Sequence, residues 1–270
     1  MEYLRQFIIV DGKETENLPI DKYERTIIYE VIRILAGTPL FLEKHIQRLN
    51  NSARILDKNI PFSVTEFSFL IKKLIGLNNS KEGNVKISIE YNGSSAVSRS
   101  IIGFIPHKYP SIEEYQIGVK TISSVNLRLN PKAKVQNEKL RNELNQIISD
   151  SEAYEALLVH PDGYITEGSR SNIFFVQGSC LITSPDNQVL SGITRENVIQ
   201  ICKENKYNLV MRSLSYSELP DMDAAFLTGT SPKVLPVKSI DKLTFKLPNE
   251  LTEEIMRKYD RLIQTYITKY

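Results

Sequence analysis

Residues 162–172 combine a turn, a short strand and a carboxylate in a way that could serve chemistry. They read Asp-Gly-Tyr-Ile-Thr-Glu-Gly-Ser-Arg-Ser-Asn, so a turn pair leads into a short alternating strand that ends at Glu167. The neighbouring segments 155–160 and 172–176 are apolar enough to be core strands. A carboxylate delivered between core strands needs a partner, because burying an unpaired charge costs more free energy than the turn could recover. Glu167 is therefore a candidate functional group whose partner must be found.

Two further loops carry glycine and threonine where one element ends and another begins. They are Gly192-Ile-Thr194 and Thr228-Gly-Thr230. Backbone N–H groups in such loops bind phosphate, threonine hydroxyls add donors, and an arginine such as Arg48 supplies a counter-charge. Taken singly, each loop is typical of an ordinary capped turn, and together they suggest one anion site. Neither loop contains the Gly-Lys-Ser/Thr sequence of a nucleotide-binding loop, and the chain has no GxGxxG motif.

A buried carboxylate, a phosphate site and a reactive amine are what pyridoxal 5'-phosphate requires. This cofactor needs a lysine for a Schiff base, an acid that keeps its pyridine nitrogen protonated, and an anchor for its phosphate. Lys134 lies between predicted strand material and a predicted helix, where it could stand at the edge of a cleft. The residues alone do not select Lys134 over Lys132 or Lys139, because most lysines lie at the surface.

Hydrophobic periodicity predicts the elements that must position these residues. Apolar residues at helical spacing predict helices over 43–57, 138–149 and 249–266, and Ser63 with Glu66 forms a capping box for another that ends at Gly76. Alternating residues predict a strand over 85–91 that pairs with 100–105, and a hairpin of 29–34 with 40–42, and a hairpin return over 178–182. Thr194 suits the N-cap of a helix that continues through Cys202.

The chain is long enough for two domains. Its 270 residues are 41% hydrophobic, as in a globular protein with a good core. Residues 106–111 contain two prolines and no periodicity, which is typical of a linker. We therefore predict a small N-terminal α/β domain over 1–115 and a larger C-terminal domain over 116–270.

Composition excludes several classes of function. The net charge of +2 provides no overall field for nucleic acid or an anionic membrane. No apolar run reaches membrane-spanning length and the first residues lack a signal-peptide pattern, so we predict a cytoplasmic protein. Two distant cysteines, Cys180 and Cys202, predict no disulfide framework. His45, His107 and His160 lack metal-ligand spacing, so we predict no metal site and assign these residues no catalysis.

Four motifs, in order along nearly the whole chain, resemble signatures of the class IV, fold-type IV pyridoxal-phosphate enzymes. They lie at residues 45–49, 164–172, 192–196 and 226–231. The family comprises branched-chain aminotransferases, D-amino acid aminotransferases and aminodeoxychorismate lyases. The resemblance implies a two-domain, D-amino acid aminotransferase-like α/β (α+β) fold. A smaller α/β sandwich domain would be joined to a larger barrel-like domain that carries most of the cofactor site. It also implies a homodimer.

The resemblance assigns roles to individual residues. Lys134, followed by Asn137 three positions later, matches the Schiff-base lysine that also moves the substrate's proton. Glu167 matches the acid on the pyridine nitrogen, and Tyr29 matches a substrate-side aromatic. The matches to the phosphate ligands are Arg48, Ile193 through its backbone N–H, Thr194 and Thr230.

Three departures concern the substrate side. Residues 23–28 replace a glycine-rich stretch, Val31 stands where the lyases carry threonine, and Arg99 is the candidate for binding the substrate carboxylate. We therefore predict an aminotransferase that acts on an amino acid, favouring branched-chain or other apolar types, and on a 2-oxo acid. The alternatives are a pyruvate-releasing enzyme similar to aminodeoxychorismate lyase and an inactive dimeric binding homologue.

Overall fold

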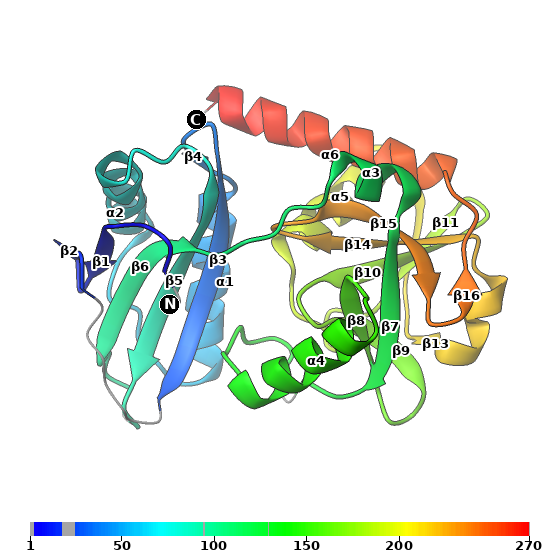
Figure 1. The fold of residues 1–270 in the computed structure, drawn as a ribbon, viewed down its shortest axis with the longest axis horizontal. Coiled ribbons are helices and arrows are strands. Elements are labelled where there is room, and N and C mark those ends of the chain that lie inside the picture. Colours follow the sequence, from blue (N-terminus) through cyan, green and yellow to red (C-terminus); the bar gives the residue numbers. More distant parts are fainter. Residues whose placement is uncertain (1–2, 18–24, 94, 129, 270) are drawn as a thin grey trace. The chain divides into compact units, whose positions relative to one another are not determined.

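The computed structural model describes residues 3–17, 25–93, 95–128 and 130–269, which form a mixed α/β structure with two sheets (Figure 1). The chain packs into two compact units. Unit 1 comprises Met1–Lys108, Ala133–Gln136 and Ile263–Tyr270, and unit 2 comprises Tyr109–Lys132 and Asn137–Leu262. Among the described residues, no helix has both the length and the apolar character needed to cross a membrane.

Unit 1 is built on a six-stranded antiparallel sheet in the order β2-β1-β6-β5-β3-β4. Its strands are β1 (Ile8–Val10), β2 (Lys13–Thr15), β3 (Thr26–Leu35), β4 (Thr38–Pro39), β5 (Gly83–Tyr91) and β6 (Arg99–Ile105). The helices α1 (Leu42–Ile55) and α2 (Val64–Leu77) pack on this sheet through a shared apolar core that includes Ile32, Leu49, Phe67, Ile87 and Phe104.

Local sequence signals account for most of unit 1. The predicted pairing of 85–91 with 100–105 is confirmed as β5 with β6. The capping box is also confirmed, because Ser63 Oγ accepts the Glu66 N–H at 3.3 Å and Glu66 Oε2 accepts the Ser63 N–H at 2.8 Å. The predicted return strand over 40–42 is wrong. Thr38–Pro39 already closes the hairpin, and Phe41 adopts a left-handed φ of 53° that begins α1.

Unit 2 contains the longer sheet, in the order β12-β11-β10-β14-β15-β7-β8-β9-β13, with β16 paired to β15. The pairs β15–β7, β7–β8 and β11–β12 are parallel and the others are antiparallel. Its strands are β7 (Val119–Val125), β8 (Glu155–Val159), β9 (Tyr164–Gly168), β10 (Asn172–Gln177), β11 (Cys180–Thr183), β12 (Asn208–Met211), β13 (Leu214–Ser215), β14 (Ala224–Gly229), β15 (Lys233–Ile240) and β16 (Leu243–Thr244). The helical elements are α3 (Ile112–Ile117), α4 (Glu138–Asp150), α5 (Ile193–Glu204), a 3-10 turn η1 (Tyr216–Asp221) and α6 (Glu250–Lys269). The residues of α6 from Ile263 onward belong to unit 1.

The segment that carries Lys134 packs with unit 1, whereas its place in the sequence predicted the C-terminal domain. Val135 forms an antiparallel bridge with Ile28 of β3. The Tyr29 N–H donates to Lys134 O at 3.1 Å, and the Gln136 N–H donates to Ile27 O at 2.9 Å. These backbone bonds fix the lysine beside β3 even though about a hundred residues of sequence lie between them. The domain boundary near residue 115 stays a prediction.

Candidate active site

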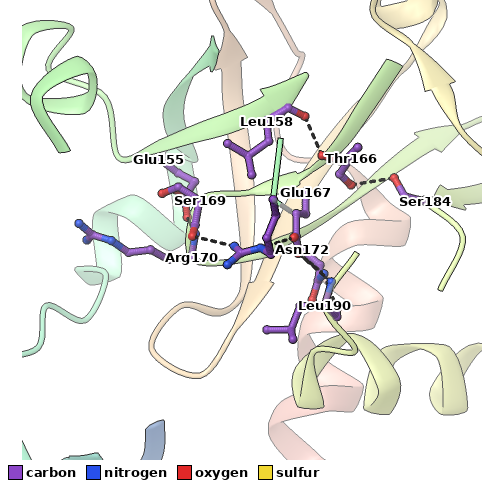
Figure 2. A network of polar contacts seen from close by, with 10 residues as sticks. Glu155, Leu158, Thr166, Glu167, Ser169, Arg170, Asn172, Ser184 and Leu190 are labelled. Atoms are coloured by element: carbon purple, nitrogen blue, oxygen red, sulfur yellow. Dashed lines mark hydrogen bonds and ion pairs between the residues drawn. The ribbon is translucent and has the colours of Figure 1, made fainter. Parts of the chain in front are cut away.

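Glu167 lies near the end of β9, and its carboxylate is 2% exposed. Oε1 accepts a hydrogen bond from Arg128 Nε at 2.8 Å. Oε2 accepts one from Asn172 Nδ2 and one from the Leu190 N–H, both at 3.2 Å (Figure 2). The buried charge is thus compensated by one guanidinium and oriented by two neutral donors, as burial of an ion requires.

Asn172, the first residue of β10, connects Glu167 to the two glycine-threonine loops. Its Nδ2 also donates to Leu190 O at 2.9 Å, and it pairs with Thr228 across β10 and β14. A Cβ at Gly192 would lie 2.0 Å from Asn172 Oδ1, so only glycine fits there. No role was assigned to Asn172, the last residue of the motif 164–172, from the sequence, and the structure places it in contact with Glu167, Leu190 and Gly192.

The loop at residues 192–194 becomes the first turn of α5. Gly192 is the N-cap of α5 and Thr194 is its second helical residue, so the prediction that Thr194 is the N-cap is wrong. The physical reason is the close approach to Asn172, which requires glycine at the cap position. Gly192 has no side chain, and it therefore provides no capping hydrogen bond. The first N–H groups of a helix have no partner within it, and they form an anion site when the cap leaves them open. Ile193 and Thr194 supply the first two of these groups, and the Thr194 hydroxyl lies 3.2 Å from Tyr259 Oη.

The second loop begins at the end of β14. Thr228 is 1% exposed, and its hydroxyl has no hydrogen-bond partner among the described residues. Thr230 is half-buried just beyond the strand. A buried hydroxyl without a partner carries a free-energy cost that a bound polar group would remove. This loop therefore suits a ligand with acceptor oxygens.

Lys134 and Tyr29 lie together in unit 1. The ammonium of Lys134 is 4.7 Å from the centroid of the Tyr29 ring, a cation–π distance. Lys134 is half-buried, whereas Lys132 and Lys139 are exposed. The three lysines thus differ in exposure, and the role of Lys134 stays a prediction.

Lys86 is a residue of this region that sequence reasoning missed. Its ammonium lies 5.4 Å from the centroid of the Tyr29 ring and donates to Gln136 Oε1 at 2.8 Å. All nine residues of β5 are buried, so Lys86 belongs to a strand covered on both faces. A lysine in a short, strongly apolar alternating strand was the signal that could have revealed it.

Arg48 lies in α1 and binds Glu30 of β3 with two hydrogen bonds. Arg48 Nε is 2.7 Å from Glu30 Oε1 and Arg48 Nη2 is 2.7 Å from Oε2, while His45 Nδ1 is 2.8 Å from Oε2. Burial by itself would raise the pKa of Glu30, but the adjacent Arg48 and His45 outweigh it and lower this pKa to about 2. Burial lowers the pKa of His45, and Glu30 offsets part of that effect.

The Arg48 helix is joined to the Lys134 segment by Ser52. This serine is fully buried, its Oγ donates to Arg48 O at 3.0 Å, and it accepts the Lys134 N–H at 3.0 Å. Arg99 lies in a different group, because its guanidinium contacts Glu90 at 2.8 Å and Glu90 also binds Arg25. Within unit 1, the structure therefore brings Arg48, Tyr29 and Lys134 into one connected region and places Arg99 with another carboxylate.

Comparison with known proteins decides the family. Residues 27–240 match the model of the family described as amino-transferase class IV. The chain belongs to the class IV aminotransferases. A D-alanine aminotransferase of Bacillus licheniformis is 31% identical over 239 residues, which cover 84% of each chain. A branched-chain-amino-acid aminotransferase of Pseudomonas aeruginosa is 27% identical over 245 residues, covering 84% of this chain and 80% of the relative.

Solved structures agree with this family assignment at the level of the fold. The branched-chain amino acid aminotransferase of Escherichia coli superimposes with a TM-score of 0.85 at 22% identity, covering 96% of this chain and 95% of that one. The predicted family and the mixed α/β fold are thereby confirmed, and so is the assignment as a class IV transferase. The roles of the individual site residues stay predictions.

Class IV aminotransferases depend on pyridoxal phosphate, and the residues of this chain fit that group. Unit 2 offers an oriented carboxylate at Glu167, an open helix N-terminus after Gly192, and the buried hydroxyl of Thr228 without a partner. These match a protonated ring nitrogen and a phosphate in charge and in donor type. Unit 1 offers a half-buried amine at Lys134.

Proposed function

We propose that this class IV family member is a pyridoxal 5'-phosphate-dependent aminotransferase. It would move an amino group between an amino acid, with branched-chain or other apolar types favoured, and a 2-oxo acid. It would act as a homodimer. The names of the two relatives support an apolar substrate, since one is a D-alanine and the other a branched-chain-amino-acid aminotransferase.

The observation that carries this proposal is the setting of Glu167. Its carboxylate is buried, accepts a hydrogen bond from the guanidinium of Arg128, and is oriented by Asn172 and by the backbone N–H of Leu190. An acid prepared in this way suits a ring nitrogen that must stay protonated during catalysis. When bound, the cofactor supplies the electron sink that withdraws charge from the substrate's α carbon.

The chain's own residues would bind, orient and transfer protons. Lys134 would attach the cofactor through its amine and carry the proton to and from the substrate's α carbon. Its half-buried position beside the Tyr29 ring restricts the directions in which the amine can move. Tyr29 and Arg99 would contact the substrate. The phosphate would be held by Arg48, Ile193, Thr194 and Thr230.

Replacement of the lysine tests the proposal. Lys134→Ala should leave a folded protein that can still bind the cofactor but shows no borohydride-reducible bond to it, measured by mass spectrometry of the reduced protein. Lys132→Ala is the matched control, because Lys132 is an exposed lysine two residues away and should retain the bond. A reducible bond that survives in Lys134→Ala would refute the assignment.

The reaction is tested with the purified wild-type protein. Single turnovers with a panel of L- and D-amino acids, followed by the visible spectrum, should convert the cofactor to its aminated form with one hand of apolar amino acids. Release of pyruvate from a single aminodeoxychorismate-like substrate, without an amino acceptor, would favour the lyase alternative. Failure to bind the cofactor after reconstitution would favour the binding homologue.

A further inference from the structure

The turn between β9 and β10 holds Glu167 at one end and Asn172 at the other. Its residues 168–171 are Gly-Ser-Arg-Ser, so the turn has no large apolar side chain to pack against a core. Small hydroxyl-bearing residues leave a backbone with many accessible conformations. The orientation of the Glu167 carboxylate therefore depends on the contacts that fix the conformation of this turn.

The carboxylate of Glu155, the first residue of β8, lies inside this turn. Glu155 is 3% exposed. Its carboxylate lies beside Ser169 and Arg170 (Figure 2). Its Oε1 accepts the Ser169 hydroxyl at 2.5 Å, and its Oε2 accepts the Ser171 hydroxyl at 3.0 Å and the Arg170 N–H at 3.2 Å. Hydrogen bonds to an ionised acceptor are roughly twice as strong as neutral ones. The single carboxylate of Glu155 thus accepts hydrogen bonds from three consecutive residues, 169–171.

The turn fits tightly around this carboxylate. A Cβ at Gly168 would lie 2.2 Å from Ser171 Oγ and 3.1 Å from Glu155 Cδ, so the backbone approaches as closely as glycine permits. The Gly168 N–H donates to Ser171 O at 2.8 Å, and the Ser169 N–H donates to Ala156 O at 2.8 Å. The backbone bonds and the Glu155 bonds therefore select the same conformation.

Arg128 holds the turn through different atoms. Its Nη2 donates to Ser169 O at 3.2 Å while its Nε donates to Glu167. The Ser169 hydroxyl donates to Glu155, and the Ser169 carbonyl accepts from Arg128. A shift of Ser169 would consequently be transmitted to the Arg128 guanidinium and from there to Glu167.

We propose that Glu155 is a positioning residue for the Glu167 acid. This inference rests on the proposed function, and it adds a role for a buried carboxylate to which the proposed function assigns none. Glu155 fixes the Ser169–Ser171 turn, and this turn sets the directions of Glu167 and Asn172 toward the ring nitrogen. The role also explains the motif's Ser-x-Ser pattern, because both serines donate to Glu155 while Arg170 contributes only its N–H there.

Glu155→Gln is the decisive variant, since it preserves the shape of the side chain and removes the charge. Either orientation of the new amide turns its NH2 group toward a backbone N–H donor, that of Ala156 at the Oε1 position or that of Arg170 at the Oε2 position, so at least one hydrogen bond is lost. We expect amide hydrogen exchange of residues 168–172 in the cofactor-free protein to accelerate about tenfold, and cofactor affinity to fall about tenfold, as for loss of one charge-assisted hydrogen bond. The absorption maximum of the bound cofactor should also shift.

Two further variants complete the experiment. Ser171→Ala removes one donor from the turn and should reproduce part of the faster exchange, which tests the proposal even if Glu155→Gln does not fold. Glu143→Gln, an exposed carboxylate in α4, is the matched control and should change none of these quantities.

The outcomes separate this inference from the proposed function. Unchanged exchange at residues 168–172 in both Glu155→Gln and Ser171→Ala would overturn the positioning role. Faster exchange with an unchanged cofactor spectrum and affinity would also overturn it, because the turn would then be structural only. If the wild-type protein itself binds no pyridoxal phosphate, the proposed function fails, and with it the role of Glu155 toward the cofactor. The exchange measurement still shows whether Glu155 fixes the turn.

Discussion

Glu30 in unit 1 and Glu167 in unit 2 are both almost fully buried carboxylates that bind an arginine, yet they are held differently. Glu30 receives two hydrogen bonds from Arg48 and one from His45, so basic side chains surround both of its oxygens. The hydrogen bonds to Glu167 include one from Arg128 and those from two neutral groups, the Asn172 amide and the Leu190 N–H.

The exposure of the two arginines extends this contrast. The Arg48 side chain is 8% exposed and that of Arg128 is 22% exposed. The Arg48–Glu30 pair is buried on both sides and joins α1 to β3, so removal of either partner would leave an uncompensated buried charge. The hydrogen bonds that Asn172 and the Leu190 N–H donate to Glu167 orient its carboxylate without adding positive charge. The comparison therefore distinguishes a carboxylate that joins α1 to β3 from a carboxylate for which we propose a ligand.

The largest expected effect is on the first of these acids. Glu30→Gln should lower the free energy of unfolding by about 3–5 kcal/mol, because it leaves the buried Arg48 charge without its counter-ion. Urea unfolding measures this change, with the exposed Glu143→Gln as control. A loss below about 1 kcal/mol, the range of surface ion pairs, would mean that Glu30 is no structural joint.

Glu167→Gln should act on catalysis. The neutral amide cannot keep a ring nitrogen protonated, so we expect kcat to fall by about 10²–10³, or ~3–4 kcal/mol in the activation barrier, with the cofactor retained. Steady-state kinetics with the best substrate of the amino acid panel measures it. Unchanged turnover would show that a different group protonates the ring, and the contrast with Glu30 would lose its functional meaning.

Lowering the pH should reduce the free energy of unfolding mainly through protonation of Glu30. Its pKa is lowered from 4.5 to about 2, so its stabilisation is present above pH 4.5 and is lost as the pH falls from 4.5 toward 2, by roughly 3 kcal/mol in total. The lowered pKa of His45 acts in the same direction below pH 6.5, because the unfolded chain then binds a proton that the folded chain does not. Urea unfolding measured from pH 7 to pH 2.5 gives the dependence of the free energy of unfolding on pH. This dependence should be weaker in Glu30→Gln.

The smallest expected effect concerns Arg128. Arg128→Lys keeps the charge but cannot bond Glu167 and Ser169 O with one planar group, so kcat should fall about tenfold, or ~1.4 kcal/mol. Stability should change little, since Arg128 is partly exposed. Arg141→Lys in α4 is the exposed control. A fall as large as that of Glu167→Gln would indicate that Arg128 does more than orient the acid.

Local chemistry made much of this structure predictable. The capping box at Ser63, the pairing of 85–91 with 100–105 and the helix over 138–149 depend on residues near one another in the chain, and the structure confirms them. The start of α5 was placed wrongly at Thr194. Its true cap, Gly192, is required by the side chain of Asn172, twenty residues away, which no local pattern contains.

The sequence by itself determined the family, the mixed α/β fold, and the short motifs in which Glu167 and Arg48 stand, and the resemblance selected Lys134 by its spacing to Asn137. It could not determine which groups those side chains bind, because each partner comes from a distant segment. Arg128 reaches Glu167 across 39 positions, and Ser52 reaches Lys134 across 82. Only the tertiary structure decided that Lys134 rather than Lys132 or Lys139 is half-buried beside Tyr29, because burial is a property of packing between segments and not of the local sequence.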